Sequence, residues 1–361
     1  MVLILGVGAL VTLGSGIAFY NFLTAPQLRK EKPKETPLVS IMIPARDEEA
    51  NIKNCLQAVL KQTYPRYEVL VIDDNSEDNT ANIVKKFSKV RFFQGKPLPA
   101  DWTGKNWALA QLVKKAKGNL YLFIDADVHL EPAALSSAVA MFQKKKVKML
   151  SCFPKQKMQG LGEWLTIPII NWLMMSFVPL DWVYRTEGDT VALAIGQFML
   201  FDSRIYNDVG GHAGVKNINL DDVELARRVK RRGEKIIAVL STGTVTCRMY
   251  DNFFASIDGI SRSFYRGAHL PPFTYVVGLL GIFFALVLPF IMVWFDTQYV
   301  YLLIPLIIAR GLLSILSRQD VLLNILLLPL HGLVAFLIGL NSIYISLTNK
   351  IVWKGRVLPK V

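Results

Sequence analysis

Carboxylate pairs placed directly after strand-like segments are the feature that most constrains this 361-residue chain. Asp125 and Asp127 follow the apolar segment Leu120–Ile124, and the pair Asp73-Asp74 ends the segment that begins at Glu68. Ligands of open α/β sheets bind outside the carboxyl ends of the strands, so these side chains are expected at one ligand-binding edge. An Asp-x-Asp sequence at such an edge can hold a divalent cation that also binds substrate phosphates.

Apolar segments alternate with predicted helices through the first half of the chain, which predicts an α/β fold with a mostly parallel sheet. The expected strands are Leu38–Ile43, Glu68–Ile72, Val90–Phe93, Leu120–Ile124 and Met149–Phe153. The expected helices run from Pro44 to about Lys61, from Asn75 to about Phe87, from Lys105 to Lys117 and from Pro132 to about Gln143. A third acidic pair, Asp221-Asp222, opens a later predicted helix.

The two ends of the chain are apolar enough to enter a membrane. Val2–Leu23 has no charge and is long enough to span a bilayer. It lacks a basic leading region and a clear cleavage site, so we interpret residues 1–24 as an uncleaved anchor. Residues 271–348 are expected to form a second transmembrane region, followed by a basic tail over 349–361. Its apolar segments are Phe273–Phe295, Tyr299–Leu316 with Arg310 inside, and Val321–Leu347.

The net charge of +13 is concentrated in clusters, the first of which follows the anchor directly. This cluster predicts a multi-pass protein of the cell membrane with its globular part, about 30–270, in the cytoplasm. Basic residues of the tail favour the same side, which leaves open whether one of the last two apolar segments is re-entrant. No nucleic-acid-recognition motif accompanies the charge, so no nucleic acid partner is expected.

The segment Gly160–Tyr184 differs from the rest of the globular part. It is rich in tryptophan and aliphatic residues and contains Pro168 and Pro179. Two interpretations stay open at this point. The segment is either a helix lying in the membrane interface or a buried core helix.

The ordered set of motifs resembles an inverting family-2 glycosyltransferase with a GT-A (nucleotide-diphospho-sugar transferase) domain. The motifs are Val39–Glu49, Val71–Asp78, Asp125–Asp127 and Asp221–Ala226. Three further segments are similar to the membrane-bound branch that glycosylates carotenoid acids or is associated with hopanoid synthesis: Pro99–Lys105, Arg248–Tyr250 and Val352–Arg356. The Gln-x-x-Arg-Trp motif of processive polysaccharide synthases is absent from the matching region, Ser261–Gly267.

The resemblance implies a UDP-linked sugar donor and a metal, Mg²⁺ or Mn²⁺. Asp73 would accept a hydrogen bond from the nucleotide base, in a pocket bordered by the Pro44 and Ala45 backbone and by Glu48. Asp127 would bind the metal, and Asp125 would hold the ribose or a metal-bound water. Lys105 and Arg262 would meet the donor diphosphate, although a solvated Lys105 and a merely helix-starting Glu48 remain alternatives.

Asp222 is the expected general base for a lipid or isoprenoid acceptor at the membrane face. Inversion needs a single base to take the acceptor proton while the diphosphate leaves on the opposite face of the sugar. Two other readings stay open. Asp125-Ala126-Asp127 also resembles the nucleophile loop of haloacid-dehalogenase-type phosphohydrolases, and within the transferases a polyprenyl-phosphate acceptor is the nearest rival.

Overall fold

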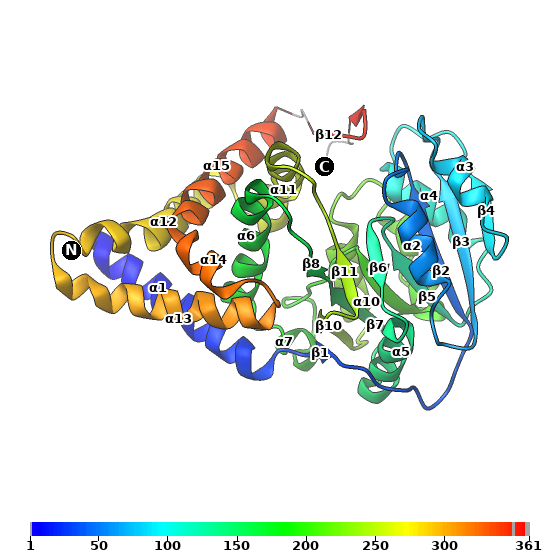
Figure 1. Cartoon of the computed structure of the whole chain (residues 1–361), viewed down its shortest axis with the longest axis horizontal. Coiled ribbons are helices and arrows are strands. Elements are labelled where there is room, and N and C mark those ends of the chain that lie inside the picture. Colours follow the sequence, from blue (N-terminus) through cyan, green and yellow to red (C-terminus); the bar gives the residue numbers. More distant parts are fainter. Residues whose placement is uncertain (1, 349–350, 358–361) are drawn as a thin grey trace. The chain divides into compact units, whose positions relative to one another are not determined.

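The computed structural model describes residues 2–348 and 351–357 of the chain. The chain forms two compact units, which are described separately below. The α/β unit comprises residues 26–155, 181–247 and the C-terminal segment from 352, and the helical unit comprises 1–25, 156–180 and 248–351. Figure 1 labels most of the elements of both units.

An eight-stranded, mostly parallel sheet organises the α/β unit, which confirms the expected fold class. Only β9 runs antiparallel to its neighbours among the described strands of this sheet. The strands, in spatial order, are β1 (Gln27–Leu28), β10 (Ile236–Ser241), β7 (Met149–Phe153), β9 (Phe198–Asp202), β5 (Leu120–Ile124), β2 (Val39–Ala45), β3 (Tyr67–Asp73) and β4 (Val90–Gln94).

Helices and short strands complete the α/β unit. The helices are α2 (Ile52–Val59), α3 (Thr80–Lys85), α4 (Gly104–Val113), α5 (Ala134–Lys145), α7 (Trp182–Arg185), α8 (Ser203–Asp208), α9 (Gly211–Gly214) and α10 (Asp221–Arg231). The short strands are β6 (Val128–Leu130), which pairs with β11 (Val245–Cys247), then β8 (Lys155–Gln156), and β12 (Val352–Trp353), which pairs with β13 (Arg356–Val357).

The helix expected from Pro44 onward begins later than predicted. Asp47 has a φ of 51°, a left-handed conformation that cannot continue a right-handed helix. The residues between Ala45 and Ile52 therefore form a loop, and α2 starts only at Ile52. This correction matters for function, because a loop at a strand's carboxyl end can present its backbone to a ligand.

The core of the α/β unit fixes strand β5 in place. All five residues of β5 are buried, and the ring of Phe123 lies 5.9 Å from that of Phe201 and 5.1 Å from that of Tyr206. Such edge-to-face and tilted ring pairs add to the stabilisation from burial. The cluster anchors the strand that delivers Asp125 and Asp127.

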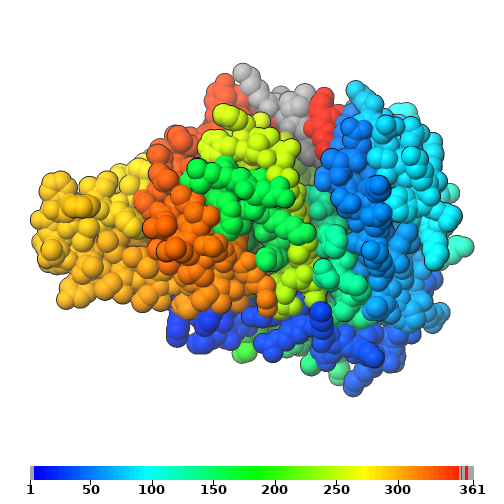
Figure 2. All heavy atoms as spheres, in the orientation of Figure 1, coloured from blue at the N-terminus to red at the C-terminus, as the bar shows by residue number. Residues whose placement is uncertain are grey.

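The helical unit contains α1 (Val2–Thr24), α6 (Leu161–Phe177), α11 (Phe253–Ala268), α12 (Pro272–Met292), η1 (Thr297–Tyr299), α13 (Val300–Leu316), α14 (Val321–Leu326) and α15 (Leu328–Leu347). Four helical stretches among the described residues are long and apolar enough to cross a membrane: Ile4–Thr24, Pro272–Met292, Thr297–Leu316 and Leu328–Leu347. The expected single segment Val321–Leu347 is broken at Leu327, between α14 and α15. Trp294 and Phe295 lie between α12 and α13, Tyr301 lies in the first turn of α13, and all three side chains are exposed. Figure 2 shows this part of the chain in gold at the molecular surface.

Helix α6, from the tryptophan-rich segment, belongs to the helical unit rather than to the α/β unit. It runs through Pro168 without a break. Its C-terminal end is tied to α1 by Asn21, whose Nδ2 donates to the carbonyls of Met175 at 2.7 Å and Val178 at 2.9 Å. The expected globular segment 30–270 therefore does not coincide with either unit, since α6 and α11 pack with the apolar helices.

We predict that Phe123→Ala lowers the apparent melting temperature of the detergent-solubilised protein. Phe123 is 1% exposed, and truncating a buried Phe typically costs about 3–5 kcal/mol through lost burial and the cavity left behind. The half-buried Phe87 provides a matched control, since Phe87→Ala removes the same atoms from a less enclosed position. Equal melting temperatures for the two variants would contradict the assigned core.

Candidate active site

Asp73 ends strand β3 at the carboxyl edge of the sheet, as the sequence predicts. The residue is 2% exposed. Its Oδ2 atom accepts hydrogen bonds from the backbone of Ser76 at 3.2 Å and from the side chain of Gln94 at 3.0 Å. Its Oδ1 atom is buried and has no hydrogen-bond partner within the described part of the chain. Because an unpartnered buried oxygen is costly, Oδ1 is suited to accept a hydrogen bond from a ligand.

The backbone of Pro44 and Ala45 lies beside Asp73, since β2 and β3 pair in parallel with Ala45 opposite Asp73. The Asp74 amide donates to the Ala45 carbonyl at 2.7 Å. Glu48 lies in the loop that follows, where its carboxylate binds the Asn51 side chain at 2.8 Å and forms an ion pair with Lys354. The carboxylate of Glu48 is thus held by side chains rather than standing alone as a helix-starting acid.

Lys105 and Asp125 form an ion pair, with Nζ 2.6 Å from Oδ1. Lys105 lies at the start of α4, and its Nζ also donates to the Gly196 carbonyl at 3.4 Å. Burial alone would lower the pKa of Lys105, but the carboxylates of Asp125, Asp221 and Asp222 raise it above its usual value. Lys105 therefore stays protonated, and the solvated alternative for this side chain is wrong.

The surroundings of Asp127 do not balance the negative charge that its carboxyl group carries when ionised. Burial first, and then the negative charges of Asp125 and Glu48, raise the pKa of Asp127 to about 7. A hydrogen bond with the Cys247 thiol lowers it, against that trend. The Oδ1 atom of Asp127 is buried without a hydrogen-bond partner among the described residues.

The chemistry of this pair fits a hard divalent cation. Within residues 2–348 and 351–357, no three His, Cys, Asp or Glu side chains gather as a metal-binding group. Magnesium and similar ions are commonly held by one or two carboxylates together with substrate phosphates, so a third protein ligand is not required. An uncompensated Asp127 and a second carboxylate on Asp125 match that donor set.

Asp222 lies in the first turn of α10, and both of its carboxylate oxygens are oriented by backbone amides. Oδ2 accepts from the Gly196 amide at 2.7 Å and Oδ1 from the Val223 amide at 2.8 Å. Burial, and then the charge of Asp221, raise the pKa of Asp222 to about 7. Such a carboxyl group can exchange a proton near neutral pH, which suits a general base.

The neighbouring Asp221 has a structural partner. Its Oδ2 lies 3.4 Å from Nε2 of the fully buried His212, and Nδ1 of His212 lies 2.5 Å from the Tyr206 hydroxyl. Burial lowers the pKa of His212, so its imidazole is neutral at neutral pH. This chain of contacts fixes the start of α10 and thereby the position of Asp222.

Arg262 lies on α11 in the helical unit, so its expected contact with the donor remains a prediction. Three groups at the α/β site were not foreseen from the sequence: Gln94, Tyr206 and Cys247. Gln94 is a polar residue that ends a strand beside β3, and that pattern would have indicated it. The other two come close to the acidic residues only through the fold.

Residues 40–210 match the family model of Glycosyl transferase family 2. This segment contains Asp73, Lys105, Asp125 and Asp127. Residues 40–210 therefore form a family-2 glycosyltransferase domain. The haloacid-dehalogenase alternative for the Asp-x-Asp sequence is therefore wrong.

Relatives of known name support the assignment. The chain is 25% identical over 270 residues to the 4,4'-diaponeurosporenoate glycosyltransferase of Staphylococcus haemolyticus, covering 72% of this chain and 69% of the relative. It is 27% identical over 235 residues to the enzyme of the same name from Staphylococcus aureus, covering 64% of this chain and 61% of the relative. The α/β fold is shared with the mannosyltransferase PcManGT of Pyrobaculum calidifontis, solved with GDP-Man and Mn²⁺, at a TM-score of 0.53 and 18% identity over 74% of this chain and 76% of the other.

We predict that Mn²⁺ stabilises the wild-type protein against heat at pH 8 and that Asp127→Asn abolishes this effect. The folded-state pKa of about 7 lies above the usual value of 3.8, so ionising Asp127 destabilises the metal-free fold as the pH rises through 7. Asp127→Asn should therefore melt at a higher temperature than wild type at pH 8 without metal. Asp208→Asn, which changes an exposed carboxylate of the same unit, is the control. An equal Mn²⁺ response in wild type and Asp127→Asn would refute the metal assignment.

Proposed function

We propose that the enzyme transfers a sugar from a UDP-linked donor to a lipid or isoprenoid acceptor, with inversion and with a divalent cation. The convergence of four carboxylates and one lysine at the carboxyl edge of the sheet is the observation that carries this proposal. Asp73 would bind the base, Asp127 and Asp125 the metal, and Asp222 the acceptor. Asp73 and Asp127 each have a buried Oδ1 atom without a hydrogen-bond partner among the described residues. Asp125 is ion-paired with Lys105, and the carboxylate of Asp222 is oriented by two backbone amides.

The donor would bind across the loops after β2, β3 and β5. The unpartnered Oδ1 of Asp73 would accept a hydrogen bond from the base, and the Pro44-Ala45 backbone and Glu48 would border it. Lys105 is positively charged and lies against Asp125, where it would help to hold the diphosphate. The cation, when bound, neutralises the negative charge that develops on the departing diphosphate.

Asp222 would act on the acceptor in a single displacement. The acceptor oxygen forms a bond to the anomeric carbon while the bond from that carbon to the diphosphate oxygen breaks, and the electron pair leaves with the diphosphate. With a hydroxyl acceptor, the hydroxyl proton passes to Asp222. With a carboxylic acid acceptor no proton is transferred, because that nucleophile is already ionised at neutral pH, and Asp222 then only helps to position it.

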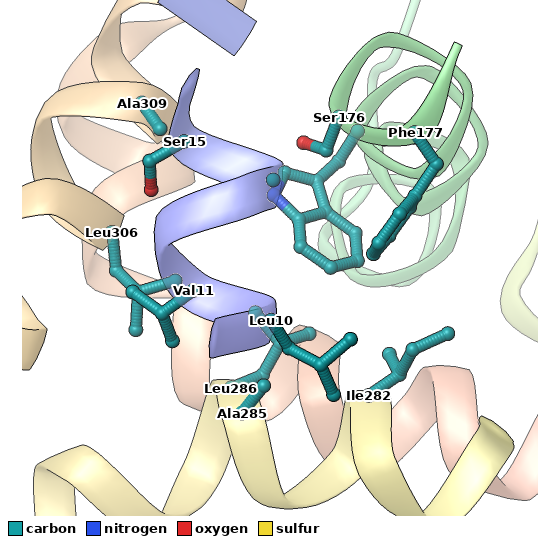
Figure 3. A pocket seen from close by; sticks show the side chains of 12 residues that line it. Leu10, Val11, Ser15, Ser176, Phe177, Ile282, Ala285, Leu286, Leu306 and Ala309 are labelled. Atoms are coloured by element: carbon teal, nitrogen blue, oxygen red, sulfur yellow. The ribbon is translucent and has the colours of Figure 1, made fainter. Parts of the chain in front are cut away.

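An apolar acceptor is supported by the relatives and by the helical unit. The relatives are named for 4,4'-diaponeurosporenoate, a carboxylate. Within the helical unit, α1, α6, α12 and α13 surround a pocket lined mainly by apolar side chains such as Leu10, Leu286 and Leu306 (Figure 3). The volume of this cavity, about 20 Å³, is too small for a hydrocarbon chain. An apolar acceptor would instead lie against the exposed apolar side chains of the long helices, such as Leu13 and Phe19 of α1.

We predict that Asp222→Asn binds UDP-sugar as wild type does but transfers the sugar slowly. With a hydroxyl acceptor the rate should fall about 10²–10⁴-fold, the usual contribution of a positioned base. With a carotenoid acid the loss should be smaller, because that nucleophile is already ionised at neutral pH, and so the size of the loss separates a hydroxyl acceptor from an ionised one. The wild-type rate with a hydroxyl acceptor should rise with pH through about 7 as Asp222 ionises, and this rise should be absent in the variant.

Single-turnover transfer and donor affinity should be measured on the same detergent-purified preparation. Asp208→Asn again serves as the control, since that carboxylate is exposed and paired with Arg232. Wild-type transfer by Asp222→Asn with a hydroxyl acceptor would remove Asp222 from the mechanism. Preferential turnover of a water-soluble sugar acceptor by the wild-type enzyme would overturn the lipid acceptor.

The membrane arrangement that we propose rests on where the chain last leaves and re-enters the α/β unit. It leaves after residue 247 and returns at residue 352. A segment that begins and ends on one side of a membrane crosses it an even number of times. Since the segment contains three long apolar helices, α12, α13 and α15, we propose that α12 and α13 cross as a pair and that α15 does not cross.

Polar contacts of α15 support this choice. Nε2 of His331 lies 2.8 Å from the Trp164 carbonyl of α6, and the Ser342 hydroxyl accepts from the Tyr265 amide of α11 at 2.7 Å. Asn341 donates to the hydroxyl of Ser261, also on α11, at 3.0 Å. Because α6 and α11 are not among the described helices that are long and apolar enough to cross a membrane, these contacts favour a position of α15 beside non-crossing helices. The basic residues after α1 favour the cytoplasm for the α/β unit.

We predict that a cysteine at Gln298, between α12 and α13, reacts with a membrane-impermeant maleimide from outside intact cells. Cysteines at Gln319 and appended to the C-terminus should react only after permeabilisation. Wild type is the control, because Cys55, Cys152 and Cys247 are all buried. Labelling of the C-terminal cysteine from outside would show an odd number of crossings and contradict the arrangement.

A further inference from the structure

The C-terminal hairpin contacts the loops at the carboxyl ends of β2 and β3, about 300 residues earlier in the chain. Strands β12 and β13 pair across a turn at Lys354 and Gly355, where both residues have positive φ. The hairpin belongs to the α/β unit, although it follows the last apolar helix directly. Its sequence, Val352–Arg356, is the tail segment that the transferase function does not by itself explain.

Lys354 binds the loop after β2. Its ammonium group donates to the carbonyls of Arg46 and Asp47, the latter at 3.3 Å, and forms an ion pair with Glu48. In return, Nε of Arg46 donates to the Lys354 carbonyl at 3.4 Å. These contacts surround the left-handed residue Asp47, which costs conformational energy that neighbouring contacts must offset.

Arg356 binds the loop after β3. Its Nη1 lies 2.6 Å from Oδ2 of Asp74, and its Nη2 donates to the Asp74 carbonyl at 3.2 Å. The side chain of Asp74 is only 4% exposed. Burial raises the pKa of Asp74, whereas the Arg356 guanidinium lowers it. Arg356 therefore compensates a buried charge on the residue next to Asp73.

The two loops are also bonded to each other, so the hairpin braces one assembly. Arg46 Nη1 donates to the carbonyls of Asp74 at 2.8 Å and Asn75 at 2.7 Å. The Asp47 amide donates to the Ser76 hydroxyl at 2.9 Å, and the Asp47 carboxylate accepts from the Glu77 amide at 2.8 Å. Displacing either loop would therefore also displace the other, and with them Asp73 at the end of β3.

We propose that Lys354 and Arg356 are positioning residues of the donor site, which hold the loops after β2 and β3 in the shape that receives the nucleoside of the donor. The inference rests on the proposed function, because that function assigns the nucleoside to Asp73 and the Pro44-Ala45 backbone. The hairpin acts through the loops and does not itself contact the ligand. It should therefore affect recognition of the nucleoside and leave the chemistry at Asp222 unchanged.

The test is calorimetric binding of uridine and of UDP to the full-length protein in detergent. Arg356→Ala should weaken both ligands by the same factor, within the range of about 5- to 150-fold usual for coupling between sites. Arg356→Lys should recover part of the affinity, because lysine keeps the charge but loses the two-pronged contact. Adding Asp74→Asn to Arg356→Ala should also recover affinity, since it removes the uncompensated buried charge. In single-turnover transfer at saturating donor, Arg356→Ala should match wild type.

Arg232→Ala is the matched control, because Arg232 forms an exposed ion pair with Asp208 in the same unit. Unchanged uridine affinity in a folded Arg356→Ala protein would overturn the inference, and so would a loss confined to UDP, which would mean direct contact with phosphate. If Arg356→Ala does not fold, Lys354→Ala is measured in the same way and judged by the same outcomes. Failure of the wild-type protein to bind uridine or UDP would instead refute the proposed function on which the inference rests.

Discussion

Parallel pairing of β5, β2 and β3 is the constraint on which the site depends. These three strands are neighbours, and Ala45 pairs with Asp73 at the ends of β2 and β3. Parallel strands end at the same edge, so acidic residues placed after them in sequence must converge in space. Convergence concentrates negative charge, and the protein compensates only part of it, with Lys105 against Asp125 and Arg356 against Asp74. The remainder, on Asp73 and Asp127, is what makes this edge suited to a cation and a polar ligand.

The sequence predicts the parts of this site that local pattern controls. Strand periodicity followed by acidic residues places Asp73, Asp125 and Asp127, and a helix start places Asp222, all confirmed in position. Local pattern predicts a helix between Ala45 and Ile52, but a loop forms there. The left-handed conformation of Asp47 is stabilised by contacts from the loop after β3 and from the C-terminal hairpin. Contacts between residues this far apart in the sequence cannot be predicted from a local pattern. For the same reason, Tyr206, Cys247 and the contacts of the hairpin could not be connected to the site before the fold was known.

The helical unit shows how an arginine is accommodated in an apolar helix. Arg310 of α13 is buried, and its guanidinium contacts the Asn324 side chain at 2.9 Å, Nδ1 of His331 at 3.0 Å and the Pro168 carbonyl at 3.4 Å. These partners come from α14, α15 and α6. A charged group away from water requires such satisfied contacts. Arg310 thus joins α6 to the C-terminal helices, and this contact is one of those that hold the tryptophan-rich segment in the helical unit.

The two adjacent aspartates at the start of α10 illustrate how environment divides roles between like residues. Successive residues on a helix point about 100° apart, so Asp221 faces the buried His212 whereas Asp222 faces the Gly196 amide. Burial alone would raise the pKa of both, but contact with His212 and the charge of Lys105 hold Asp221 below its usual value while Asp222 rises to about 7. Paired carboxyl groups whose pKa values are pushed apart commonly take different parts in a reaction. Asp221 stays ionised and structural, and so Asp222 is the group that can accept a proton at neutral pH.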